Sequence, residues 1–164
     1  MNPKRVGPWL AWAVTILSAL PAAAADKALN ISIFPPIALA KPEDAVTAVR
    51  LDLLYGRNTA TKVVDLGLVN HTTTGMASGL QWGFINITES HLSGLQLAAL
   101  NIDKGTTNGL QWGGINYAKT GGGLQLALVN YAEEMSGVQI GAVNIIKKGG
   151  FLPVMIIANW GKKK

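Results

Sequence analysis

The sequence predicts an all-β repeat fold, and three features of its 164 residues carry that prediction. The first feature is a series of asparagines at steps of 14 to 16 residues: Asn70, Asn86, Asn101, Asn116, Asn130, Asn144 and Asn159. The second is a Gly-hydrophobic-Gln octet that ends on five of them, and the third is strict alternation of side chains within each octet. A unit of about 15 residues is too short to bury an apolar face alone, so it must stack on or pair with its neighbours.

Each octet has the pattern of an extended strand. In residues 79–86, Leu80, Trp82 and Phe84 share one face, whereas Gln81 and Ile85 share the other. Polar, Gly- and Asn-containing segments such as 103–108 separate the octets and are predicted to be turns. The third position of the five octets is always glutamine: Gln81, Gln96, Gln111, Gln125 and Gln139.

The chain divides into four predicted parts. Residues 1–25 combine Lys4 and Arg5, an apolar stretch and a run of alanines after Pro21, which predicts a signal peptide cleaved after Ala25 and an exported protein. The apolar stretch is short for a membrane-spanning helix. Residues 26–45 are predicted to be an N-terminal cap segment, 46–160 the β-repeat domain and 161–164 a basic tail.

The outermost repeats are predicted to be diverged caps. Residues 49–55 and 64–70 fit the same columns upstream, and residues 151–159 keep the spacing downstream. The last of these units lacks the glutamine and contains Pro153. Terminal units of repeat proteins commonly differ in this way because they face solvent on one side.

A β-solenoid with about 15 residues per coil is the architecture that we expect. Equivalent positions would stack at roughly 4.8 Å, with glutamines and asparagines forming two ladders of amide hydrogen bonds. The glycine that begins each octet would let the chain turn a corner. The predicted core consists of the leucine and tryptophan face: Leu80, Trp82, Leu95, Leu97, Leu110, Trp112, Leu124, Leu126, Val138 and Ile140.

The alternative architecture is a small eight-stranded antiparallel β-barrel of the outer-membrane type. Its strands would present leucine and tryptophan to lipid and glutamine to the lumen, with Arg50 and Asp65 as an interior ion pair. An antiparallel meander, however, would place successive asparagines at opposite ends of the barrel. A solenoid would place every asparagine at the same position of its coil, so one structural role explains all of them. The similar length of all connections also favours the solenoid.

The octets resemble those of the bacterial surface-repeat proteins of the leptospiral type, whose unit is a Gly-Leu-Gln-Leu-Gly-Leu-Val-Asn-like string repeated at 14 to 15 residues. The resemblance covers roughly residues 46–160. It implies an exported or surface location and brings no catalytic residues. The chain departs from the pattern at its end, where a lysine tail replaces the terminal aromatic residue typical of barrel-assembly signals.

Composition argues against several classes of function. The chain has no cysteine, which excludes lipidation at a cysteine and a disulfide framework. Its net charge is +5, and apart from the tail lysines and the pair Lys147 and Lys148 its basic residues are scattered, so no nucleic-acid footprint is predicted. His71 and His91 are its two histidines, and both are expected in solvent-facing connections, so no metal site, cofactor site or catalytic site is predicted.

These observations predict a non-enzymatic envelope or surface protein that serves as a structural or interaction scaffold, located at the outer membrane or cell surface, or in the periplasm. Expected partners are envelope components, including outer-membrane lipid, with no small-molecule substrate. A structural or narrow-pore role accompanies the barrel alternative. Trp82 and Trp112 occupy one column two units apart and form the candidate interaction surface, although core positions are the competing interpretation.

Overall fold

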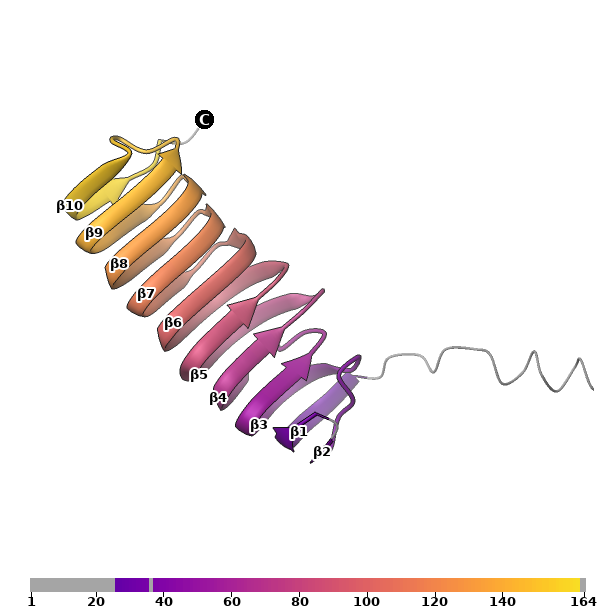
Figure 1. The fold of residues 1–164 in the computed structure, drawn as a ribbon. Helices are drawn as coiled ribbons and strands as arrows, with labels where there is room; N and C mark the ends of the chain where they lie inside the picture. Colours follow the sequence, from indigo (N-terminus) through magenta and orange to yellow (C-terminus); the bar gives the residue numbers. More distant parts are fainter. Residues whose placement is uncertain (1–25, 36, 163–164) are drawn as a thin grey trace, which may run out of the picture.

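The computed structural model describes residues 26–35 and 37–162, so the predicted signal peptide and the last two lysines lie outside the described residues. These described parts form one ten-stranded sheet that coils into a stack, as Figure 1 shows. The strands are β1 (Asp26–Phe34), β2 (Ile37–Ala38), β3 (Ala45–Asn58), β4 (Val64–Thr72), β5 (Met76–Thr88), β6 (His91–Thr107), β7 (Leu110–Gly121), β8 (Leu124–Met135), β9 (Val138–Lys148) and β10 (Val154–Trp160).

The fold is the predicted β-solenoid, with coils of about 15 residues. Strand β1 pairs with β3, and each later strand pairs with the next through β9, all in parallel. Gln81 therefore stacks on Gln96, and Asn86 stacks on Asn101. The antiparallel barrel alternative is wrong, because parallel stacking lets identical octets meet in register and pair identical amides.

The long strands bend within a single element, so a coil is more continuous than its sequence indicates. Ladder pairing between β5 and β6 is interrupted at residues 83 and 84, as expected where a strand bends. Figure 1 shows the long strands bending around one edge of the stack. Strand β6 also continues through most of the connection predicted at 103–108, because Thr106 and Thr107 pair with Thr120 and Gly121 of the next coil.

The prediction of a leucine and tryptophan core is wrong. All ten predicted core residues are half-buried or exposed, whereas the glutamines of the octets are at most 2% exposed. The interior consists mainly of glutamine, asparagine, threonine and alanine, such as Ala118 and Ala132, with a few larger apolar side chains, such as Leu92 and Ile146. A coil of about 15 residues encloses too narrow a space for indoles, and stacked amides satisfy one another's hydrogen bonds without water.

Two amide ladders run through this interior, as the sequence predicts. In the asparagine ladder, each Nδ2 donates to the Oδ1 of the next coil, at 2.9–3.0 Å from Asn70 to Asn144. The same nitrogen also donates to backbone carbonyls at the bend, as Asn116 does to Gln111 and Leu126. The glutamine ladder has distances of 2.7–2.9 Å from Gln81 to Gln139.

The glycine that begins each octet allows close approach between coils. A Cβ atom on Gly109 would lie 2.0 Å from the carbonyl oxygen of Gly94, far inside van der Waals contact. Gly79 in addition has a φ of +88°, which L side chains rarely adopt. These positions form the second corner of the coil, as the sequence predicts.

The last unit does not continue the asparagine ladder. Strand β10 runs antiparallel to β9, so Asn159 lies opposite Gln139 and Met155 lies opposite Asn144. Asn159 is buried and donates to the carbonyl of Leu152 at 2.8 Å. The chain reverses at Gly149, which has a φ of +80°, and the unit keeps the repeat spacing without its direction. The inclusion of Asn159 in the predicted ladder is therefore wrong.

Candidate functional site

The outward face of the octets is apolar and exposed. Trp82 is 61% exposed, Phe84 60% and Trp112 59%, and Leu128 reaches 70%. These side chains point outward because alternation along the strand points the neighbouring glutamines and asparagines inward. The two tryptophans therefore lie on the surface, where the candidate interaction surface requires them, and not in the core.

Trp82 and Trp112 lie in one column but do not adjoin. Leu97 pairs with both of them, so it separates the two indoles by one coil. Two inter-strand steps correspond to about 9 to 10 Å. The tryptophans thus belong to a longer apolar column, in which Leu126 and Ile140 continue the same line.

Charge is absent from this part of each octet coil. We define the uncharged edge as the outward side chains of residues 80–87, 95–102, 110–117, 124–131 and 138–145, which include no acidic, basic or histidine residue. The exposed charges follow at the next corner, at Glu89, Lys104, Lys119 and Lys147. The coil is therefore amphipathic in cross-section, with a polar interior, an apolar edge and a charged corner.

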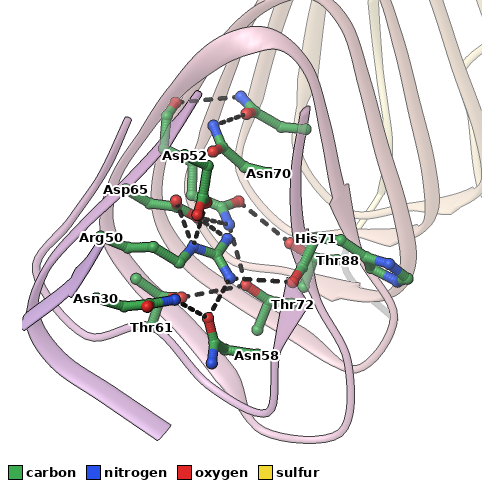
Figure 2. A network of polar contacts seen from close by, with 12 residues as sticks. Asn30, Arg50, Asp52, Asn58, Thr61, Asp65, Asn70, His71, Thr72 and Thr88 are labelled. Atoms are coloured by element: carbon green, nitrogen blue, oxygen red, sulfur yellow. Dashed lines mark hydrogen bonds and ion pairs between the residues drawn. The ribbon is translucent and has the colours of Figure 1, made fainter. Parts of the chain in front are cut away.

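A buried ionic cluster lies inside the first coils (Figure 2). The guanidinium of Arg50 is fully buried and donates to both carboxylate oxygens of Asp65, through Nε at 2.6 Å and through Nη2. Arg50 Nε also lies 3.0 Å from Oδ2 of Asp52. Its Nη1 donates to the carbonyl of His71 at 3.1 Å. The interior ion pair of Arg50 and Asp65, which the sequence suggests for a barrel, is present in the solenoid.

Asp65 connects this cluster to the glutamine ladder. Each glutamine Nε2 donates toward the N-terminal end of the stack, and the last of these donors, on Gln81, reaches Asp65 Oδ2 at 3.0 Å. The asparagine amides donate in the opposite direction, so the dipoles of the two ladders oppose each other. Within residues 26–35 and 37–162, three buried side-chain acceptors have no hydrogen-bond partner: Oε1 of Gln139 and Oδ1 of Asn70, one at an end of each ladder, and Oδ2 of Asp52.

Asp52 is a member of this network that the sequence did not predict. Burial raises the pKa of its carboxyl to about 6, while Arg50 and the Ser32 hydroxyl that donates to it act in the opposite direction. The negative charge of Asp65 raises the pKa further. Arg50 and Asp52 are two residues apart on one strand, so both point inward. This spacing of two residues is the sequence signal that places Asp52 on the same inward face as Arg50.

Because the Asp52 pKa is higher in the folded chain than its ordinary 3.8, the folded chain binds this proton more tightly. Its contribution to stability is therefore present below about pH 4 and is lost as the pH rises to about 6, by about 3 kcal/mol. We expect Asp52→Asn to be more stable than wild type by about 1–3 kcal/mol at pH 8 and equal to it near pH 4.

Urea unfolding between pH 4 and 8 measures this difference, and Asp26→Asn, at an exposed carboxylate, is the matched control. Subtracting the change in unfolding free energy of Asp26→Asn from that of Asp52→Asn removes the general effect of losing a carboxylate. A wild-type curve parallel to that of Asp52→Asn over this range would contradict the assigned pKa.

His71 is not the solvent-facing residue that the sequence predicts. Its Nδ1 lies 2.6 Å from the Tyr55 hydroxyl, and its Nε2 lies 3.1 Å from Glu89 Oε1. Burial lowers the pKa of His71 and raises that of Tyr55, so the phenol keeps its proton at neutral pH. The order of phenol, imidazole and carboxylate resembles that of a catalytic triad, but a protonated phenol is a poor nucleophile. The contact ties together three neighbouring coils.

No group of three or more His, Asp or Glu side chains placed to hold a metal ion occurs in residues 26–35 and 37–162. The same residues contain no helix long and apolar enough to cross a membrane. Comparison of the chain with family models, curated proteins and solved structures found no match.

Proposed function

We propose that the protein is an exported bacterial envelope or surface protein that acts as a non-enzymatic scaffold and contacts another envelope component through the uncharged edge. The observation that carries the proposal is the combination of a regular β-solenoid with an apolar outer edge that runs along successive coils. The largest apolar patch on a soluble monomer, typically about 300–600 Å², is often a functional surface.

Two further features support this proposal. The leader pattern of residues 1–25 favours export. The interior ladders use their side-chain amides for one another and for backbone carbonyls, so they are engaged in holding coils together. The polar groups of the repeats are thus structural, and the outward side chains are left for recognition.

Fractionation of bacteria that express the full chain tests the proposal. We expect a processed protein in the envelope fraction, whereas a variant without residues 2–25 stays in the cytosol. The edge variant, Trp82→Gln/Phe84→Gln/Trp112→Gln, is expected to lose most of its envelope retention after a high-salt wash.

The matched control for the edge variant is Leu39→Gln/Met76→Gln/Leu152→Gln, which removes three exposed apolar side chains outside the uncharged edge. We expect it to be retained like wild type. Wild-type protein that remains unprocessed in the cytosol, or an edge variant retained as well as the control, would overturn the proposed function.

A further inference from the structure

We infer that the partner of the uncharged edge is the apolar layer of a lipid bilayer surface, into which the edge inserts without spanning it. This inference rests on the proposed function and specifies the chemistry of the component that the scaffold contacts. It follows from the shape of the edge, from its border and from a hollow at one end.

The edge is convex. Trp82 lies before the bend of its coil, Phe84 lies within it and Ile85 follows it, so apolar side chains occupy both flanks of a ridge. Figure 1 shows this bend repeated along the stack. A second protein surface would cover one flank of such a ridge, whereas fluid acyl chains can surround both.

The area of one flank is small for a stable protein partner. The five strands from β5 to β9 span four steps of about 4.8 Å, or roughly 19 Å, and a flank of three residues is about 10 Å wide. One flank therefore offers roughly 190 Å², well below the 800 Å² or so that each partner contributes to a standard interface. The shape and the area together disfavour a dimer of this chain through the edge.

Aromatic and basic side chains border the ridge. Tyr117 and Tyr131 stack with their ring centroids 5.4 Å apart, at the end of the flank that precedes the charged corner. Lys147 Nζ lies 5.5 Å from the Tyr131 ring, and the Tyr117 hydroxyl donates to Glu133 at 2.8 Å. Tyrosine and lysine with apolar stems and polar tips are the side chains that suit the boundary between acyl chains and water.

An open apolar hollow continues the edge at its N-terminal end. Its volume is 510 Å³, and Leu51 and Leu66 in its wall belong to the column that Trp82 continues. The remaining lining is also mainly aliphatic: Ile31, Ile33 and Leu53, with Ser32, Asp52 and Gly67. An acyl chain fits such a lining, because it offers apolar contact along its length.

The backbone of the ridge also tolerates an apolar environment. Its N–H and C=O groups pair in the parallel ladders, and Asn116 and its equivalents bond carbonyls at the bend where ladder pairing is interrupted. Backbone groups without partners would oppose insertion, because the acyl layer cannot hydrogen-bond them. The inward amides therefore make the outer edge suited to lipid.

The test is flotation of protein purified from cells that express the full chain with vesicles of phosphatidylcholine alone or with added phosphatidylglycerol. We expect wild type to bind both kinds of vesicle, with a blue shift of tryptophan emission. We expect the edge variant Trp82→Gln/Phe84→Gln/Trp112→Gln to bind at least about tenfold more weakly, and the control Leu39→Gln/Met76→Gln/Leu152→Gln to bind like wild type. Circular dichroism and urea unfolding verify that both variants keep the fold.

The outcomes separate the two proposals. Wild type that binds neither vesicle, or an edge variant that floats as well as wild type, would overturn the lipid partner. If the edge variant still loses envelope retention in cells, the proposed function survives with a protein partner instead. Sedimentation of wild type as a dimer that the edge variant abolishes would assign the edge to a second copy and overturn the inference. Vesicle binding by a chain that cells never export would overturn the proposed function alone.

Discussion

Replacing Arg50 by methionine is expected to lower the free energy of unfolding at pH 7 by about 3–5 kcal/mol, because it leaves the buried carboxyls of Asp52 and Asp65 without their cation. Methionine occupies similar space and supplies no donor. The loss is expected to shrink at pH 5, because burial raises the pKa of Asp52 to about 6 and proton uptake by its carboxyl removes one of the two uncompensated charges. Urea unfolding at the two pH values measures it.

Arg57→Met is the matched control for this prediction, since Arg57 lies on the same strand and is exposed. We expect its effect to stay within about 0.5 kcal/mol. The second control is Arg50→Met/Asp65→Asn, which removes one cation and one anion and is expected to recover part of the stability at pH 7. A loss that is equal at pH 5 and pH 7 would show that the charge balance of the cluster does not set its stability.

Replacing Asn116 by aspartate is expected to be comparably destabilising, by about 3–5 kcal/mol at pH 7, although the two side chains have nearly the same shape. The Asn116 Nδ2 donates to Asn130 Oδ1 at 3.0 Å and to the carbonyls of Gln111 and Leu126 at 2.9 and 3.1 Å. A carboxylate there would face three acceptors in a fully buried position. At low pH, the protonated acid regains one donor, so stability is expected to recover in part.

Asn108→Asp provides the comparison, because Asn108 is an exposed residue between β6 and β7. Unfolding in urea at pH 7 and pH 4 measures both variants, and amide hydrogen exchange locates the change. We expect faster exchange across β7 and β8 in Asn116→Asp alone. Equal stability of the two variants at pH 7 would contradict a dry asparagine ladder inside the coil.

Both predictions depend on the same property of the molecule, which is a polar interior in which nearly every buried group has an assigned partner. A leucine in a conventional core loses contact energy when it is trimmed. An amide in a ladder has a partner on the coil above and on the coil below, so a substitution disturbs both. The solenoid is therefore expected to tolerate substitutions on its outer edge far better than within its ladders.

The sequence by itself determined the repeat, its coil length and its ladders. Equal spacing of Asn70 to Asn144 requires equal positions to meet, and parallel stacking is the arrangement in which they do so along the whole stack. The octet glycines likewise indicate a corner from their position alone, because only glycine allows the close approach of Gly109 to Gly94. These properties recur at a fixed spacing, so they can be read by comparing the units along the sequence.

The tertiary structure alone decided which face of each strand is inside. Alternation in residues 79–86 defines two faces, and their hydrophobicity argues for Trp82 inside and Gln81 outside. The opposite arrangement prevails because Gln81 gains its partners, Gln96 and Asp65, from other coils. The tertiary structure also decided the reversal of β10 and the position of Asp52 beside Arg50. Each depends on contacts between coils, which a single repeat does not contain.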